Sequence, residues 1–408
     1  MSLARLEDGA HGVLPSQLIE EAIGAGYIDA GRFKITPESI QPASLDLRLG
    51  DTAYRIRCSF LPHDEPVERK LKDLIVDELD LRKEGAVLET NRPYLIPLAE
   101  SLALPAYMRG KANPKSSTGR LDVFTRVISD NSYRFDEVAA GYSGPLYLEV
   151  VPLSFPIRVR EGLALNQLRL MIGSAALDDH ELWDAHERSP ILLHQGIAVS
   201  RQHFATSSGL FLSLDLKGDE GGRVGYRARE HASLLDMSRV GSYDIDEYWE
   251  PVRREGRDRI VLDPERFYLL LSEESVCVPP TLACEMTAFD PTSGELRTHY
   301  AGFFDPGFGY DPAGELHGSR AALEVRAHDV PFMIEHGQRV CKLTFERMIA
   351  EPDRLYGQSL GSNYQGQVDT VGKHFRKPQT ANVERLKPKL GDDPSTPSLF
   401  SEFDDRPA

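Results

Sequence analysis

The sequence predicts an all-β protein with a few peripheral helices, arranged as two tandem domains that each form a distorted β-barrel or a jelly-roll-like sandwich. Two observations lead to this fold class. Short segments rich in branched and aromatic residues recur along the chain, bounded by Pro or Gly, which is typical of strands. Blocks of sequence also occur twice in the same order. Many short strands with few helices favour a barrel or sandwich in each copy. The expected strands cover 94–104, 145–153, 268–278, 321–326 and 339–346.

The internal repeat has a nearly constant offset. The segment that starts at Tyr94 returns at Tyr268, 174 residues later. Leu148-Glu-Val returns as Leu323-Glu-Val after 175 residues, and two further blocks repeat in the same order. Because such an order and spacing rarely arise by chance, we interpret the chain as a duplicated domain. The first domain is expected over 1–195, and the second, in which the motifs are degenerate, over 196–375.

Helices are expected only at the edges of the fold. Apolar residues share one face of a predicted helix over 15–24, and glycines suit its C-terminal end. A second helix is predicted over 68–80. From about residue 376 the chain becomes polar and rich in Pro, so the tail 376–408 is expected to be disordered.

Composition and charge argue against several classes of protein. The formal net charge of -16 over 408 residues does not fit a general nucleic-acid binder, which needs clustered Lys and Arg. No apolar run reaches the roughly 18 residues of a membrane helix. Acidic residues near the N-terminus do not fit a signal peptide, so a cytoplasmic protein is expected. The four cysteines form no C-x-x-C pair, which argues against a zinc ribbon and a disulfide scaffold.

One turn of the first copy gathers groups that suit phosphate. Lys115, Ser116, Ser117 and Arg120 bring hydroxyls and cationic side chains together within a few residues. Such donors around one turn can surround phosphate oxygens. A polar turn with a solvated arginine is the alternative interpretation of the same residues.

Glu149 and Glu324 are unusual because each lies within an apolar strand segment. Since a strand alternates faces, one explanation is that the carboxylate points to water. The other is that burial raises its pKa and suits it to act as a general base. The zinc-dependent nucleobase deaminases are excluded, because they need a C-x-x-C pair that the chain lacks.

Taken together, these motifs resemble the dCTP deaminase branch of the dUTPase superfamily. Six segments carry the resemblance in the expected order, at 41–50, 115–120, 141–149, 162–168, 305–309 and 356–367. The last of these is similar to the family's lid, which folds over the nucleotide. Asn363 departs from the pattern, because the family usually has Lys there, so one phosphate contact is either missing or supplied elsewhere.

The resemblance implies dUTPase-type β-barrels and the hydrolytic deamination of dCTP to dUTP and ammonia in pyrimidine deoxynucleotide metabolism. In this family no zinc takes part, Mg²⁺ binds with the triphosphate, and a glutamate activates water against C4 of cytosine. The implied catalytic residues are Ser116, Arg120 and either Glu324 or Glu149. The implied substrate-binding residues are Lys115, Ser117, Asp305, Tyr356, Tyr364 and Gln367.

The motifs alone leave the general base undecided. Family members are trimers whose sites lie between subunits, with the Ser-Ser turn and the glutamate strand on different subunits. If the two halves divide the site in the same way, the turn of the first half faces a strand of another domain. That division favours Glu324 over Glu149. Whether the duplicated chain forms a homo-oligomer is left open.

Other functions also stay open at this point. A pyrophosphatase that converts dUTP to dUMP, or a bifunctional enzyme that performs both steps, belongs to the same superfamily. A non-catalytic nucleotide-binding regulator is a further alternative, because one copy has lost part of its motif. The last alternative is a duplicated β-barrel protein with an unrelated role. Release of ammonia, of pyrophosphate or of neither separates the first three.

Overall fold

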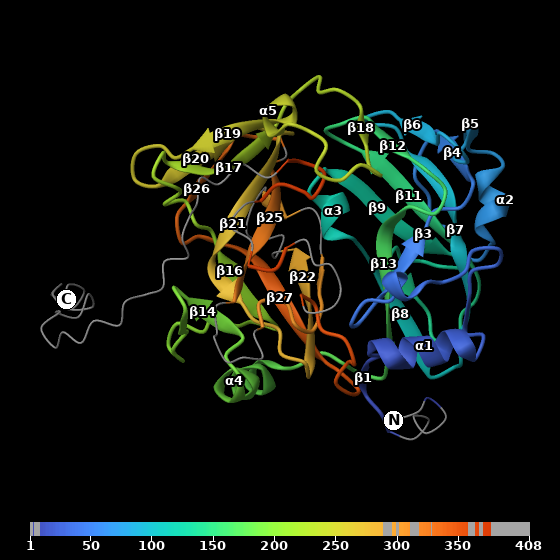
Figure 1. The fold of residues 1–408 in the computed structure, drawn as a ribbon, viewed down its shortest axis with the longest axis horizontal. Helices are drawn as coiled ribbons and strands as arrows, with labels where there is room; N and C mark the ends of the chain where they lie inside the picture. The colour runs from blue at the N-terminus through green and yellow to red at the C-terminus, as the bar shows by residue number, and fades with distance from the viewer. Residues whose placement is uncertain are drawn as a thin grey trace, which may run out of the picture. The chain divides into compact units, whose positions relative to one another are not determined.

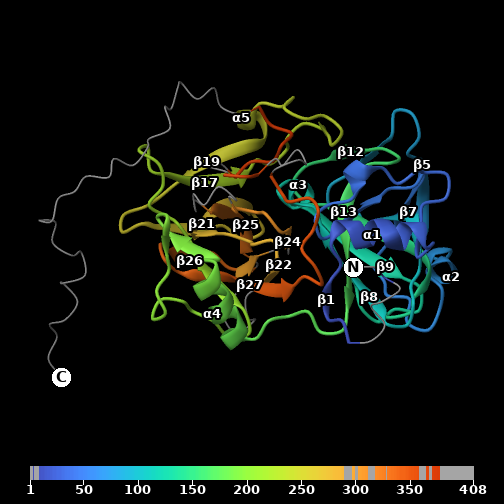
Figure 2. The ribbon, with the colours of Figure 1, turned by 60° about the horizontal axis from the view of Figure 1, so that its bottom comes forward.

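The computed structural model describes residues 3, 9–288, 296–298, 302–310, 318–327, 329–357, 364–366 and 370–376. These residues form mainly β-structure with several antiparallel sheets, as predicted (Figure 1). Three helices lie on the outside of the sheets, namely α1 (Ser16–Gly24), α2 (Val67–Leu71) and α4 (Asp179–Arg188). α1 is at the lower edge in Figure 1 and in front of the strands of the first half in Figure 2. The predicted disordered tail lies outside the described residues from 377 onward. No helix among the described residues is long and apolar enough to cross a membrane.

The first half of the chain contains two antiparallel sheets. One has the order β1-β13-β8-β10, with β3 also paired to β13. Its strands are β1 (Gly12–Val13), β3 (Leu45–Arg48), β8 (Met108–Pro114), β10 (Glu137–Val138) and β13 (Ala164–Ile172). The other has the order β5-β4-β7-β11-β9, with β2 also paired to β7. Its strands are β2 (Ile28–Asp29), β4 (Thr52–Ile56), β5 (Ile75–Asp80), β7 (Tyr94–Ala103), β9 (Val123–Ser129) and β11 (Ser143–Pro152).

The second half repeats this plan with its own sheets. The smaller has the order β16-β27-β22-β24. Its strands are β16 (Leu210–Ser213), β22 (Leu282–Ala288), β24 (Phe303–Phe304) and β27 (Arg339–Arg347). In the larger, β15-β14-β21-β17-β19 form the main order, β25 pairs with β21, and β23 pairs with β25. Its strands are β14 (Leu192–His194), β15 (Ile197–Ala198), β17 (Arg223–Ala228), β19 (Trp249–Arg253), β21 (Phe267–Val276), β23 (Leu296–Thr298) and β25 (Ser319–Ala327). A separate pair joins β20 (Arg259–Leu262) to β26 (Phe332–Glu335).

Strand pairing repeats between the halves in register as well as in order. The pair β7–β11 corresponds to β21–β25, and β8–β13 corresponds to β22–β27. Glu149 lies opposite Leu95 in the first pair, and Glu324 lies opposite Leu269 in the second. The two glutamates therefore occupy the same place in equivalent strands.

The two halves share both a sheet and a core. β12 (Ile157–Val159) pairs with β6 (Ala86–Leu88) on one side and with β18 (Leu235–Asp236) of the second half on the other. The hydrophobic core of the first half also includes Leu269. Because Leu269 lies beside Glu324, that face of β21 and β25 is turned toward the first half.

The helices agree with the sequence prediction in part. α1 matches the helix expected over 15–24. The helix expected over 68–80 is wrong beyond its first turn, because α2 ends at Leu71 and β5 follows, paired with β4. The β-branched residues Ile75 and Val76 favour that strand. α4 has no counterpart among the predicted elements. The remaining short helical segments are η2 (Pro37–Ser39), α3 (Ser116–Gly119) and α5 (Ile245–Tyr248).

Candidate functional site

The predicted phosphate-binding turn folds as α3, a single helical turn at the end of β8. Lys115 is extended and leads into the turn, Arg120 caps its end, and Asp122, two residues further on, has a φ of 57°. The turn is fastened to β13, since the carbonyl oxygen of Leu165 accepts from the N–H of Lys115 at 3.0 Å and from the hydroxyl of Thr118 at 2.8 Å. The turn is therefore held on the first half at both its start and its middle.

Glu324 of β25 reaches this turn from the second half. Its carboxylate packs directly on Gly119. A Cβ atom at position 119 would lie 2.6 Å from one carboxylate oxygen and 2.8 Å from the other, so only glycine leaves room for the carboxylate. The structure thus brings one of the two candidate glutamates together with the Ser-Ser turn.

Burial dominates the electrostatics of Glu324. The residue is 7% exposed, and desolvation raises the pKa of its carboxyl to about 8. The positive charge of Arg120 opposes this rise, and the negative charge of Asp122 adds to it. A carboxyl with such a pKa can hold and release a proton near neutral pH, as an acid–base catalyst must.

Glu149 has different surroundings, although its strand position is equivalent. Arg126 of β9 donates to both carboxylate oxygens, at 3.0 and 3.2 Å, and the hydroxyl of Ser59 donates to one of them at 2.9 Å. The ring of Phe135 lies 3.7 Å from the same guanidinium. These partners all belong to the first half, and they hold the carboxylate in a buried ion pair.

Arg120 is covered by the C-terminal part of the chain. Its guanidinium lies 3.8 Å from the ring centre of Tyr364, and its Nη1 donates to the carbonyl oxygen of Thr370 at 3.0 Å. The residue is 4% exposed. Burial raises the pKa of Tyr364, and the nearby Arg120 charge opposes the shift. A predicted lid residue and a predicted catalytic residue are therefore in direct contact.

The loop 305–309 anchors other predicted lid residues. The N–H of Tyr356 donates to a carbonyl oxygen of this loop at 2.9 Å. Gly307 has a φ of 101° and no space for a side chain beside Tyr356. Gln365 accepts from an N–H of the loop at 3.0 Å and donates to the carbonyl oxygen of Gly307 at 3.2 Å. Gln365 was not predicted, and Gln367, which was, lies outside the described residues.

Asp305 itself is engaged by a fully buried arginine of the first half. Arg169 of β13 donates to Asp305 at 3.1 Å and to Glu346 at 2.8 Å. Burial raises the pKa of Asp305, and Arg169 opposes that shift. In this structure Asp305 joins the two halves, and its expected contact with substrate stays a prediction.

The remaining predicted residues surround the start of α3. Lys115 forms an ion pair with Asp46 of β3, a carboxyl whose pKa is raised by burial and lowered by Lys115. Ser117 is buried. The hydroxyl of Ser116 faces the second half, since a Cβ atom on Gly302 would lie 3.9 Å from it. Cationic and hydroxyl groups thus lie at this end of the turn, and their contact with phosphate stays a prediction.

An ion pair that the sequence analysis missed joins the turn to the strand of Glu324. Arg326 of β25 donates to the buried carboxylate of Asp122, which also accepts from the hydroxyl of Ser154 at 2.5 Å. Arg326 follows Glu324 by two positions, so both side chains lie on one face of β25. No local signal marks this pair, because 204 residues separate its members and each alone resembles an ordinary surface charge.

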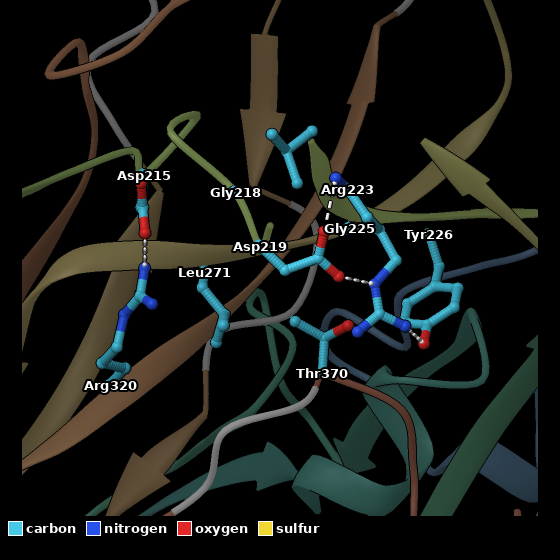
Figure 3. Close-up of a pocket in the computed structure, with 10 residues that line it drawn as sticks. Asp215, Gly218, Asp219, Arg223, Gly225, Tyr226, Leu271, Arg320 and Thr370 are labelled. Atoms are coloured by element: carbon cyan, nitrogen blue, oxygen red, sulfur yellow. Dashed lines mark hydrogen bonds and ion pairs between the residues drawn. The ribbon is translucent and has the colours of Figure 1, made fainter. Parts of the chain in front are cut away.

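A cavity of about 180 Å³ borders the site (Figure 3). Two ion pairs line it, Arg320 with Asp215 at 2.6 Å and Arg223 with Asp219 at 3.1 Å. Thr370 also lines this cavity, and its carbonyl oxygen accepts a hydrogen bond from Arg120. None of the predicted site residues is among its lining residues.

Potential metal ligands do not cluster in the described part of the chain. There, no three His, Cys, Asp or Glu side chains are grouped as a metal site requires. The four cysteines are free thiols, and burial raises the pKa of Cys277 to about 12. A thiol with so high a pKa stays protonated and unreactive at neutral pH.

Two family models together match most of the chain. The model of the 2'-deoxycytidine 5'-triphosphate deaminase N-terminal domain matches residues 10–174, and the model of the C-terminal domain matches 178–375. A crystal structure of 2'-deoxycytidine 5'-triphosphate deaminase from Agrobacterium tumefaciens is 48% identical in sequence. It superposes with a TM-score of 0.80 and covers 86% of this chain and 100% of its own.

Curated relatives match a smaller part of the chain. The dCTP deaminase, dUMP-forming, of Corynebacterium glutamicum (strain R) is 32% identical over 149 residues, which is 35% of this chain and 74% of the relative. The dCTP deaminase of Natronomonas pharaonis is 32% identical over 142 residues, which is 34% of this chain and 68% of the relative. The chain therefore belongs to the dCTP deaminase family of enzymes, as a long form that carries both its N-terminal and its C-terminal domain.

Proposed function

We propose that the protein deaminates dCTP hydrolytically to dUTP and ammonia, at one site that two barrel-like halves build within a single chain. The observation that carries the proposal is the packing of the Glu324 carboxylate on Gly119, beside Arg120. This arrangement unites the acid–base group of one half with the phosphate-binding turn of the other. Family membership and the names of the relatives support dCTP as the substrate.

In this proposal Glu324 is the general base. It takes a proton from a water molecule as the water oxygen attacks C4 of cytosine. The carboxyl then returns a proton to the amino group, which leaves as ammonia when the C4–N bond breaks. A pKa of about 8 supports both transfers, because proton donation and acceptance are then both accessible near neutral pH. The scheme assigns no residue to zinc, and Ser116 and Arg120 orient the reacting groups.

The substrate in this scheme is dCTP with Mg²⁺ bound to its triphosphate. Lys115 and Ser117 contact phosphate oxygens, to which cations and hydroxyls donate strong hydrogen bonds. Asp305 is assigned to substrate binding, and the lid residues Tyr356, Tyr364 and Gln367 are assigned to closing over the nucleotide. A free deoxynucleotide as substrate also fits the expectation of a cytoplasmic enzyme.

The decisive experiment compares Glu324→Gln with the matched variant Glu149→Gln. Purified protein is given dCTP and Mg²⁺, and ammonia and dUTP are measured. We expect Glu324→Gln to lower kcat by roughly 10²–10⁴-fold, the usual contribution of a general base. Glu149→Gln should keep most of the activity, because its carboxylate pairs with Arg126. Melting temperatures of both variants control for misfolding. Loss of activity in Glu149→Gln alone would assign the base to the other half.

A bifunctional enzyme is the second candidate, because the Corynebacterium glutamicum relative is named as dUMP-forming. The same assay separates the candidates when pyrophosphate and dUMP are followed beside ammonia. Ammonia with intact dUTP supports deamination alone. Equal amounts of ammonia and pyrophosphate support both steps. Binding of dCTP without any product would instead support a regulator.

A further inference from the structure

We propose that Lys373 is a further ligand of the substrate triphosphate and acts together with Lys115 across the carboxylate of Asp46. The inference rests on the proposed function and deepens it. It adds a binding residue from the C-terminal strap, by which we mean residues 370–376. Nothing in the sequence motifs singles out this lysine.

The strap is anchored at both of its ends. At its start, the carbonyl oxygen of Thr370 accepts from Arg120 at 3.0 Å. At its end, Phe375 is 3% exposed and packs on the rings of Tyr248 and Trp249, with centroids 5.5 and 6.0 Å away. Between these points the strap runs beside α3, since a Cβ atom on Gly372 would lie 3.8 Å from Cβ of Arg120.

The backbone of Lys373 is fixed by hydrogen bonds on both sides. Its N–H donates to the hydroxyl of Tyr364 at 3.3 Å, and its carbonyl oxygen accepts from the N–H of Gly241 at 3.0 Å. The half-buried side chain lies within electrostatic range of the start of α3. Burial lowers the pKa of Lys373, Lys115 lowers it further, and Asp46 opposes both effects.

The balance of charge among Lys115, Lys373 and Asp46 indicates which kind of ligand these residues bind. Asp46 forms its ion pair with Lys115, and among the described residues no carboxylate is paired with Lys373. The second carboxylate near Lys115 and Asp46 is that of Asp305, and it is bound by Arg169. The ammonium group of Lys373 is therefore left without an ion-pair partner in a partly buried place among the described residues. Burying an unbalanced charge is unfavourable unless an anion compensates it. The hydroxyls of α3 lie at the same end of the turn, so the anion that fits is a phosphate chain.

The formal net charge of -16 makes this local excess more significant. An acidic protein repels a polyanion unless a cationic cluster offsets its field at the binding site. Lys373 supplies positive charge that Asp46, which is paired with Lys115, does not neutralise. We therefore expect its removal to weaken binding of the nucleotide and to leave the chemical step at Glu324 intact.

The test compares Lys373→Met with Lys373→Arg and with the control Arg376→Met. Arg376 lies three positions along the same strap, but its guanidinium pairs with Asp244 at 2.6 Å. For Lys373→Met we expect KM for Mg²⁺-dCTP to rise roughly tenfold or more, the size expected for one charged hydrogen bond. The kcat should stay within about twofold. Lys373→Arg keeps the cation and should approach the wild type, as should Arg376→Met.

A phosphate series distinguishes binding from a structural effect. With dCTP, dCDP and dCMP as substrates, the loss of kcat/KM in Lys373→Met should shrink as phosphates are removed. A merely structural role would lower kcat/KM by the same factor for all three. That result, or an unchanged KM for dCTP, would overturn the proposal.

Calorimetric titration with Mg²⁺-dCTP separates this inference from the proposed function. If the wild type binds dCTP but releases no ammonia, the proposed function fails. Binding that is at least tenfold weaker in Lys373→Met would still support Lys373 as a phosphate ligand. Equal affinity of the wild type and Lys373→Met would overturn it, whether or not the enzyme turns over.

Discussion

Glu324 is a buried carboxyl whose preferred state near neutral pH carries a proton. Its pKa of about 8 compares with an ordinary value of 4.5, and desolvation is the largest cause. The same environment that suits an acid–base catalyst therefore penalises the ionised folded protein. Stability and catalytic function are linked at this one residue.

This link predicts that Glu324→Gln gains stability relative to the wild type as the pH rises. Between about pH 4.5 and pH 8 the folded wild type keeps a proton that the unfolded chain has released. Raising the pH then lowers the free energy of unfolding of the wild type by up to about 1.4 kcal/mol per pH unit. Glutamine cannot ionise, so the variant lacks this contribution. Denaturant unfolding at several pH values in this range measures the difference, and parallel curves would contradict the prediction.

Among the elements, β25 and the segment after α3 are joined by the ion pair of Arg326 with Asp122. Both side chains are buried, and Asp122 stands at a positive φ, which Asp and Asn tolerate better than most residues. The pair lies two positions from Glu324 along β25. It therefore aligns the strand that bears the proposed base with the turn that bears Arg120.

We predict that Arg326→Met destabilises the protein by about 3 kcal/mol, because it removes a cation from a fully buried carboxylate. Activity should fall as well, because β25 loses its alignment with α3. Adding Asp122→Asn should recover part of the stability, since asparagine keeps the backbone conformation without the charge. Thermal or denaturant unfolding of the two variants tests this. A double variant no more stable than Arg326→Met would argue against the ion pair as the cause.

Local patterns predicted the elements better than the contacts between them. The five predicted strand segments, which correspond to β7, β11, β21, β25 and β27, follow from branched residues bounded by Pro and Gly. The repeated strand pairing agrees with the repeat in the sequence. The helix over 68–80 failed because its β-branched residues pair with β4. α4 was missed, although Asp178 and Glu181 form a capping box that marks its start.

In the candidate site, too, local patterns were more informative than anything the sequence says about contacts between distant segments. Lys115, Ser116 and Arg120 were predicted as site residues from one turn, and their roles stay predictions. The motifs alone left the two glutamates undecided, because both occupy equivalent strand positions in the two repeats, and only the family's division of the site between subunits favoured Glu324. What separates them is tertiary: Arg126 neutralises Glu149, whereas Glu324 packs on a turn about two hundred residues away in the sequence.

In the molecule as a whole, the turn and the glutamate strand of the site come from the same chain. We therefore predict that Glu324→Gln and Arg120→Ala do not complement each other when the two purified variants are mixed. Each variant chain still contains one defect in its own site. Deamination of dCTP by the mixture, over a range of protein concentrations, measures this. Recovery of a substantial part of the wild-type activity would mean that sites form between chains.

The equivalent positions of Glu149 and Glu324 also have an evolutionary consequence. In an assembly of identical chains, one codon specifies the same residue in every site, so no copy can change alone. In a fused duplicate, each position is encoded separately. Glu149 can then be recruited to a local ion pair with Arg126, while Glu324 keeps its contact with the turn. On our interpretation of the chain as a duplicated domain, each half has its own mutational history. The strand of Glu149 can then become purely structural, while the strand of Glu324 keeps the proposed reactive role.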